Sequence, residues 1–304
     1  MSTKQNCILR DPIDTSAINV KNKIKTHLIN WPSFKKNIDL KLIYDTFIKK
    51  GIYKPPSLET CEKKIKRDDL TPICIWMIVV NKLLELSQQR LKILQSFEID
   101  NSILEEYNEI GILRISLKYD FPPLAFIEKI INFKKFKTTR DSKNFKTAMR
   151  NDVSSPSVKD FSKQLSDKYE MNIRNMFRDK NISFKTENSL KHEQIQDFGK
   201  ALCTVDILFL DNVHILDLVT NKFIKINWLE VKTYTLTENE MLLPKIKKQL
   251  TKYVSKWGHG AVLFKYGYTI DLDIKGVFQL DGTDVKKLDF ADKYFNENTV
   301  VVNI

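Results

Sequence analysis

The spacing of apolar residues changes character about halfway along the chain. In the first 150 residues, apolar positions recur every three or four residues, which is the period of an amphipathic α-helix. This period predicts helices over residues 18–29, 40–48 and 70–97. Thr71 and Pro72 mark the start of the longest helix, because threonine is a favoured cap and proline is tolerated in the first helical turn.

Residues 112–131 have the pattern of two short helices joined by a turn. Residues 112–118 and 122–131 are helical by period, and residues 119–121 form the turn. This arrangement resembles a helix-turn-helix, in which the second helix approaches nucleic acid. Many helical hairpins bind nothing, and residues 122–127 are more apolar than a base-reading helix needs to be. We therefore favour contact with a nucleic-acid backbone or a partner protein over sequence readout.

Basic residues and phenylalanines are interspersed over residues 133–150. This mixture suits phosphate neutralisation and base stacking. It equally suits the solvated end of a helix followed by an interdomain linker. Residues 151–157 have linker composition, so we expect one domain over residues 1–150 and another over residues 151–304.

The second half of the chain mixes helix-period segments with short β-type runs. Helices are expected over residues 158–179 and 244–257, and residues 190–199 form either a loop or a helix. The expected strands cover residues 182–184, 205–209, 213–218, 223–232, 261–266 and 277–280. The resulting order, α-β-β-β-α-β, is typical of a small α/β core with a mixed sheet. The whole chain is therefore expected to be an α+β protein.

The composition fits a soluble globular protein with a polyanionic partner. The chain has 304 residues, enough for two domains, and 42% of them are hydrophobic and 29% charged. The net charge is +12 and the isoelectric point is about 9.3, which suits nucleic acid. Lysine, asparagine and isoleucine are abundant, as in a protein with an AT-rich coding sequence. The charge therefore supports nucleic-acid binding without establishing it.

Cysteine spacing and the lengths of the apolar runs indicate which cellular compartment to expect and whether the chain crosses a membrane. Cys7, Cys61, Cys74 and Cys203 form no CxxC pair and have no histidine at zinc-finger spacing, so neither a zinc site nor a disulfide framework is indicated. We expect a reducing compartment, the cytosol or the nucleus. The first residues lack the apolar core of a signal peptide, and residues 73–80 are too few to cross a bilayer, so no membrane association is expected.

Two carboxylates and a lysine lie on neighbouring predicted strands. Asp206 lies at the start of one strand, and Glu230 and Lys232 lie near the end of another. Alternation along the second strand places five side chains on one face: Ile224, Ile226, Trp228, Glu230 and Lys232. Charged groups at the end of an apolar face are costly unless they have partners. The pattern therefore indicates a built site.

A divalent cation would give this cluster its chemistry. Mg²⁺ binds a few carboxylate oxygens and keeps several waters, so Asp206, Glu230 and the carbonyl of Val231 would form its ligand set. The ion would polarise a phosphodiester and acidify a water, and Lys232 would orient that water or stabilise charge on the phosphate. The alternative is a surface ion pair on a hairpin, because an isolated D…ExK pattern is common by chance.

Two helices supply further candidates. Gln249 and Tyr253 are four residues apart and share a helix face, where an amide and a phenol would hold a substrate strand or the attacking water. The alternative is that Tyr253 packs in the core and Gln249 is a surface residue. Glu170 lies beside the apolar face of the helix over residues 158–179.

The order Glu170, Asp206, Glu230-Val231-Lys232 and Gln249-x-x-x-Tyr253 resembles the PD-(D/E)xK nuclease superfamily and the QxxxY element of its RecB-like members. More closely, the chain resembles the codanin-interacting nuclease family, whose hallmark is a Thr-Pro-Asp motif. The resembling stretches lie within residues 110–280 and are residues 115–121, 204–206, 228–232, 249–253 and 258–267.

This resemblance implies an N-terminal all-helical domain with a helix-turn-helix and a C-terminal restriction-endonuclease-like α/β core with a mixed central sheet. It implies Mg²⁺ or Mn²⁺ at Asp206 and Glu230, with Lys232 as the catalytic lysine. Glu170 occupies the place of an acidic residue on the first core helix that often helps to bind or orient metal. The resemblance also implies a codanin-like protein partner and a nuclear or cytoplasmic setting.

Two positions depart from the family pattern. Val205 replaces the usual proline of Thr-Pro-Asp, and His259 stands where Gly-Pro-Gly is common. Proline stiffens the strand entry but supplies no ligand, so its loss should not remove catalysis. His259 is suited either to contact phosphate or to be a satisfied loop histidine.

The leading hypothesis from the sequence is a divalent-metal-dependent nuclease that hydrolyses DNA or RNA. A second hypothesis is a catalytically silent nucleic-acid-binding or adaptor protein on a nuclease scaffold, since fold does not establish activity. A third is a transcription regulator that acts through residues 119–132. The sequence decides neither the substrate nor the oligomeric state.

Overall fold

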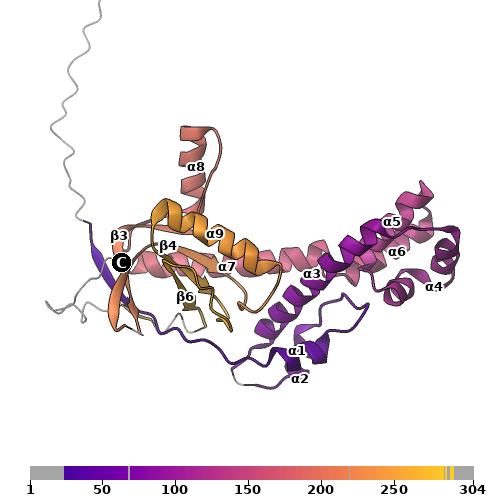
Figure 1. Cartoon of the computed structure of the whole chain (residues 1–304), viewed down its shortest axis with the longest axis horizontal. Coiled ribbons are helices and arrows are strands. Elements are labelled where there is room, and N and C mark those ends of the chain that lie inside the picture. Colours follow the sequence, from indigo (N-terminus) through magenta and orange to yellow (C-terminus); the bar gives the residue numbers. More distant parts are fainter. Residues whose placement is uncertain (1–23, 68, 219, 284, 286–287, 291–304) are drawn as a thin grey trace, which may run out of the picture.

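The computed structural model describes residues 24–67, 69–218, 220–283, 285 and 288–290 (Figure 1). The helices in this part of the chain are α1 (Leu40–Phe47), α2 (Leu58–Lys64), α3 (Pro72–Ser96), α4 (Asn101–Tyr119), α5 (Pro123–Lys134), α6 (Thr139–Arg150), α7 (Pro156–Asp179), α8 (Glu187–Phe198) and α9 (Leu242–Trp257). The strands are β1 (Thr26–Asn30), β2 (Phe184–Thr186), β3 (Ile207–Asp217), β4 (Lys222–Lys232), β5 (Gly260–Phe264), β6 (Val277–Asp281) and β7 (Asp289–Phe290).

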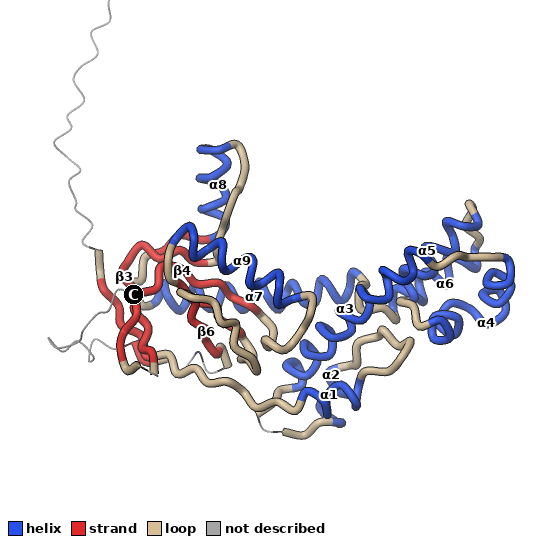
Figure 2. The backbone as a smooth tube through the Cα atoms, in the orientation of Figure 1, coloured by secondary structure: helices blue, strands red, loops and turns tan. Residues whose placement is uncertain are grey.

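A mixed sheet forms one end of the molecule (Figure 2). Over the described residues its order is β6-β5-β4-β3-β1-β7, and β2 pairs with β3 outside this path. β4 is antiparallel to β3 and parallel to β5, whereas β1 runs parallel to β3. The expected α+β class, with N-terminal helices and a C-terminal mixed sheet, is confirmed.

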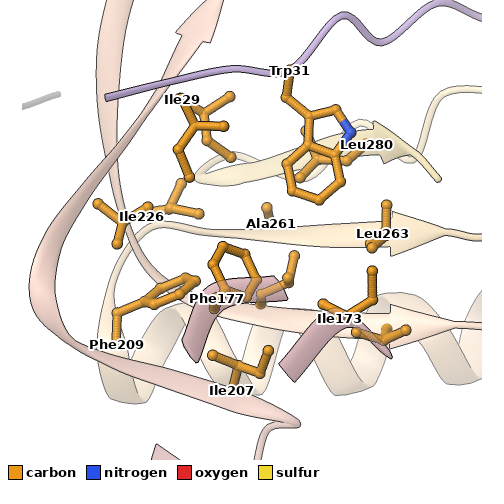
Figure 3. Packing of buried hydrophobic residues seen from close by; sticks show 14 of the residues in the cluster. Ile29, Trp31, Ile173, Phe177, Ile207, Phe209, Ile226, Ala261, Leu263 and Leu280 are labelled. Atoms are coloured by element: carbon orange, nitrogen blue, oxygen red, sulfur yellow. The ribbon is translucent and has the colours of Figure 1, made fainter. Parts of the chain in front are cut away.

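Helices cover both faces of this sheet. On one face, α7 contributes Ile173 and Phe177 to a cluster of buried side chains (Figure 3). The sheet side of that cluster includes Ile29, Ile207, Ile226, Ala261, Leu263 and Leu280. On the other face, α9 contributes Ile246, Leu250 and Tyr253 to a separate cluster. Because each face is covered, the strands are buried on both sides and hold their end residues in fixed positions.

The N-terminal helices form two further clusters. α1 and α2 pack around the start of α3, and this cluster also includes Val153 and Tyr266. α4, α5 and α6 pack with the end of α3 around Tyr107, Ile115 and Phe126. Figure 1 shows these last helices at the end of the molecule opposite the sheet, with α3 and α7 between the two ends. The division into domains of residues 1–150 and 151–304 stays a prediction.

The predicted helical elements of this region are largely confirmed. α3 begins at Pro72, and the Thr71 side chain accepts a hydrogen bond from the backbone N–H of Cys74, as expected of a cap. The helical hairpin is also present: α4 ends at Asp120, whose φ of 55° turns the chain into α5. Gly111, with a φ of 77°, interrupts α4, so the predicted helix start at residue 112 follows this break.

The second helix of the hairpin is poorly suited to reading a groove. α5 buries Pro123, Phe126, Ile127 and Ile130 in its own cluster. Among its exposed residues is an acid, Glu128, which would repel phosphate. This burial argues against the interpretation of residues 119–132 as a sequence reader.

Two predicted elements of the first half are wrong. Residues 26–29 belong to strand β1 and not to a helix, because they pair with β3 in a parallel ladder; residues 18–23 of that predicted helix, and Cys7, lie outside the described residues. The interpretation of residues 133–150 as a helix end plus linker is also wrong. Thr138 and Asp141 form a capping box that begins α6, which continues to Arg150.

The five side chains of β4 that were predicted to share one face do not all do so, because the pairing of β3 with β4 is irregular. Residues 205–209 and 213–218 were expected as separate strands, but residues 207–217 form the single strand β3. Residues 209–212 of β3 lie opposite Asn227 alone, so the register shifts there. Ile226 therefore packs on the α7 face, whereas Trp228 packs on the α9 face.

Three of the four cysteines and every helix named above lie in the described part of the chain. Cys61, Cys74 and Cys203 are buried free thiols. Within that part of the chain, no helix combines the length and the apolar character needed to cross a bilayer.

Candidate active site

Antiparallel pairing brings the start of β3 next to the end of β4. Ile207 pairs with Leu229, so Asp206 lies beside the last residues of β4. The N–H of Val231 donates a hydrogen bond of 2.7 Å to Oδ2 of Asp206. In a strand, the N–H and C=O of one residue point to the same side. The Val231 carbonyl therefore faces the Asp206 side of β4, whereas the next carbonyl, of Lys232, accepts from Lys265 after β5.

Glu230 and Lys232 point from β4 toward α9, where Gln249 joins them. Lys232 Nζ lies 2.6 Å from Oε1 of Glu230 and 3.2 Å from Oε1 of Gln249. Gln249 Nε2 lies 2.8 Å from Oε1 of Glu230 and 2.6 Å from the Tyr253 hydroxyl. The Tyr253 ring packs against Trp228 at 5.4 Å between centroids. Gln249 therefore holds both charged groups, and the buried Tyr253 supports Gln249.

The carboxylate of Glu230 is only partly satisfied. This residue is 4% exposed, and none of the described residues gives its buried Oε2 a hydrogen-bond partner. Burial raises the pKa of Glu230, although the neighbouring Lys232 ammonium and the backbone N–H of Asp206 oppose this shift. Burial alone would lower the pKa of Lys232, but the Glu230 carboxylate raises it above its usual value. A buried oxygen that lacks a donor is costly, so a cation at this point would stabilise the site.

The carboxylate of Asp206 is also destabilised in its charged form. Burial, and then the negative charge of Glu230, raises the pKa of Asp206. The hydrogen bond from Val231 and the charge of Lys232 oppose this shift without overcoming it. Two desolvated carboxylates that repel one another favour either a shared proton or a bound cation.

Glu170 reaches the same cluster from α7. Burial, and then the charge of Asp206, raises the pKa of Glu170 to about 7. Its carboxylate accepts a hydrogen bond of 3.2 Å from Arg174, one turn further along the helix. Ser166 Oγ lies 3.0 Å from Thr233 Oγ1, which joins α7 to the segment after β4. The expected acidic residue of the helix thus lies close enough to Asp206 for their charges to interact.

The donor set fits a hard divalent cation with few protein ligands. Over the described residues, no group of three or more histidine, cysteine or acidic side chains has a metal-holding arrangement. Two carboxylates, Asp206 and Glu230, and the Val231 carbonyl remain as oxygen donors. Mg²⁺ is commonly held by one or two carboxylates and keeps several waters. The unpartnered Oε2 of Glu230 is the observation that favours a cation here.

The sequence interpretation missed one acidic residue of this cluster. Glu187, the first residue of α8, raises the pKa values of Asp206, Glu230 and Glu170 by its charge. Its Oε1 accepts hydrogen bonds of 3.2 Å from the Thr204 hydroxyl and 2.8 Å from Lys191. The available signal was Thr186 as a cap followed by an acid in the first turn.

The loop before β5 has a packing role. Trp228 Nε1 donates to the Gly258 carbonyl at 2.8 Å. A Cβ at Gly260 would lie 2.1 Å from the Trp228 ring, so only glycine fits there. These contacts fix Trp228 beneath Tyr253. These contacts are made by the two glycines that flank His259 and not by the histidine side chain.

The comparisons with known proteins cover less than half of the chain. An uncharacterized protein, L539 of Acanthamoeba polyphaga mimivirus, is 32% identical over 124 residues, which are 41% of this chain and 42% of that protein. The match thus spans less than half the length of that relative. No solved structure matches the chain. Residues 137–282, which contain every residue of the candidate site, match the model of the family described as "Protein of unknown function TPD sequence-motif".

Proposed function

We propose that this protein is a divalent-metal-dependent nuclease that hydrolyses phosphodiester bonds of DNA or RNA. The observation that carries the proposal is the carboxylate of Glu230: its Oε1 contacts Lys232 and Gln249, whereas its buried Oε2 has no hydrogen-bond partner in the described part of the chain. Asp206, with its raised pKa, provides the second carboxylate of the pair.

Asp206, Glu230 and the Val231 carbonyl would hold Mg²⁺ or Mn²⁺. When bound, the ion supplies charge for the phosphate and a water of lowered pKa. Glu170 would orient this assembly from α7. Ionised carboxylates are the form that binds a cation, so metal binding would release the protons that the raised pKa values favour.

Lys232 is the residue suited to act on the substrate. Glu230 and Gln249 hold its ammonium in place, at 2.6 Å and 3.2 Å. An ammonium has three donors, so one remains for a phosphate oxygen or the attacking water. Charge developing on the phosphate would be stabilised there by a group that is already oriented. Gln249 would position Lys232 or hold the substrate strand, and the buried Tyr253 would support Gln249 from behind.

A cleavage panel tests the proposal. Single-stranded, duplex and branched DNA and RNA are incubated with Mg²⁺, Mn²⁺ or EDTA, using the wild type, Asp206→Asn and Lys232→Gln. We expect cleavage with either metal, none with EDTA, and a loss of at least about 100-fold in both variants. Glu128→Gln on α5 removes an exposed acid far from the site and is the matched control.

The panel also separates the two leading hypotheses. If the wild type binds nucleic acid but cleaves none of these substrates, the catalytically silent adaptor describes the protein better. If Asp206→Asn and Lys232→Gln both cleave as well as the wild type, any activity belongs elsewhere.

A codanin-like partner in the nucleus or cytoplasm is proposed on the resemblance alone. The burial of the apolar side chains of α5 argues only against groove reading at this end of the molecule. Co-precipitation of the full chain with a codanin-like protein tests it, and failure of the two to associate would remove this part of the proposal.

A further inference from the structure

A row of lysines follows the solvent side of α9. Lys245, Lys248, Lys252 and Lys256 are three or four residues apart, so they form one stripe along the helix. All four are exposed, and α9 contains no aspartate or glutamate. Across the described residues, no salt bridge joins any of the four to a carboxylate. Lys245, Lys248 and Lys256 of this lysine row are therefore available for an anionic partner, whereas Lys252 also donates to a backbone carbonyl.

The lysine row runs alongside the candidate active site. Gln249, one turn after Lys245, contacts Glu230 and Lys232. A backbone of phosphates laid along the row would therefore pass beside the cluster that would cut it. α9 therefore carries both Gln249, which contacts the site, and the positively charged row.

Exposed apolar side chains lie at the end of α8 and in the loop after it, which Lys252 of the row contacts. Ile195, Phe198 and Leu202 are 52%, 61% and 43% exposed. α8 stands away from the body of the molecule (Figure 1), and only Leu190 and Gln194 of this helix are buried.

Hydrogen bonds join the loop after α8 both to α8 itself and to α9. The Gln194 side chain accepts hydrogen bonds from the N–H groups of Leu202 and Cys203, at 2.8 Å and 2.9 Å. Lys252 Nζ donates to the Leu202 carbonyl at 2.6 Å. The loop after α8 is thus folded back on the helix and joined to the lysine row. This loop therefore connects the exposed apolar end of α8 to the lysine row, and the two together form the candidate surface.

We propose that this surface binds an unpaired nucleic-acid strand, with phosphates on the lysine row and a base stacked on Phe198. This inference rests on the proposed function of the site. Single strands combine a phosphate backbone with exposed base faces, and proteins bind them with basic grooves and aromatic side chains. A duplex buries its base faces within the stack, so it would use the lysines and leave Phe198 unused. The substrate class is therefore unpaired DNA or RNA.

Fluorescence anisotropy tests the inference without turnover. Labelled oligo-dT, oligo-rU and a blunt DNA duplex are titrated with the wild type in EDTA. We expect the unpaired strands to bind more tightly than the duplex at equal salt. Phe198→Ala should weaken binding of the unpaired strands about tenfold, the range expected for loss of one stacked base, and leave duplex binding unchanged. Phe34→Ala removes a ring that is 66% exposed in the segment between β1 and α1 and is the matched control.

Salt dependence tests the lysine row. The triple variant Lys245→Gln, Lys248→Gln and Lys256→Gln should lower the slope of log K against log salt by about 2 for a single strand. Lys252 is left in place because it holds the loop after α8. The matched control replaces the exposed Lys92, Lys159 and Lys163 by glutamine, which removes the same charge from α3 and α7.

The outcomes separate this inference from the proposed function. Wild-type affinity in Phe198→Ala, equal slopes in the two triple variants, or tighter binding of the duplex would overturn the inference, even if Asp206-dependent cleavage occurs. Conversely, the expected binding changes in a protein that cuts nothing would support the inference and defeat the nuclease.

Discussion

Lys232 and Glu230 form a salt bridge of 2.6 Å that uses only one oxygen of the carboxylate. The second oxygen, Oε2, is buried and forms no hydrogen bond with the residues that the structure describes. The lysine therefore does not have to leave for a cation to bind. A metal ion and the ammonium can be held by opposite oxygens of one side chain, which keeps both next to the same phosphate.

Metal binding should stabilise the fold. A ligand that binds only the folded state adds about 2.7 kcal/mol to the free energy of unfolding at a concentration of 100 times its Kd. We expect Mg²⁺ and Mn²⁺ to raise the melting temperature of the wild type. Glu230→Gln removes one carboxylate and should lose most of this rise, whereas Glu128→Gln should keep it. An equal rise in both variants would mean that the ion binds elsewhere.

Asp206 has a structural role that can be separated from its charge. Its Oδ2 accepts the N–H of Val231. Asp206→Asn keeps an acceptor there and removes the charge, so we expect little loss of stability. Asp206→Ala leaves a buried N–H without a partner, which costs about 1–3 kcal/mol. Urea unfolding in EDTA measures both free energies, and equal stability of the two variants would contradict the role of this hydrogen bond.

The pH dependence of stability follows from Glu170. Its folded pKa, about 7, lies above the ordinary value of 4.5, so the folded state binds more protons than the unfolded state between these values. The contribution of Glu170 is complete below pH 4.5 and is lost as the pH rises toward about 7. Asp206 acts in the same direction, since its pKa is also raised.

We therefore expect the metal-free protein to lose stability as the pH rises from 4.5 to about 7. Melting temperatures measured across this range in EDTA check the sign. Glu170→Gln removes this titration and its pairing with Arg174, so it should flatten the dependence to the part that comes from Asp206. If the melting temperature of this variant falls with pH as steeply as that of the wild type, groups other than Glu170 cause the dependence.

Long periodic elements were predictable from the sequence. α3, α7, α9 and β4 all appear within a few residues of their expected positions, because each element is long or has one face against the core. Asp206, Glu230 and Lys232 come together because the hairpin of β3 and β4 is local in sequence. Glu170 and Gln249 approach them because amphipathic helices place their polar flanks beside the buried stripe.

Long-range pairing and local irregularity were not predictable. The apolar residues of β1 suit either a helix or a strand, and only the parallel ladder with β3 decides between them. The shift opposite Asn227 moves Ile226 and Trp228 to different faces, which no strict two-residue period anticipates. Glu187 resembles an ordinary acid in the first turn of a helix, and only the tertiary fold brings it toward Asp206.

The amide of Gln249 gives the last prediction. It bridges Glu230 and Lys232, so Gln249→Leu should leave the ammonium less well oriented and lower kcat about 10- to 100-fold, the range for residues that position catalytic groups. Tyr253→Phe keeps the ring against Trp228 and removes only the hydroxyl that contacts Gln249, so a smaller loss is expected.

The division of the effect between kcat and KM distinguishes two roles for Gln249. If this residue positions Lys232, kcat falls while KM stays close to its wild-type value. If it holds the substrate strand, KM rises and kcat is kept. Tyr253 is 5% exposed, so its hydroxyl has little access to a substrate and should change kcat alone. A rise in KM for Tyr253→Phe would require the helix to move when substrate binds.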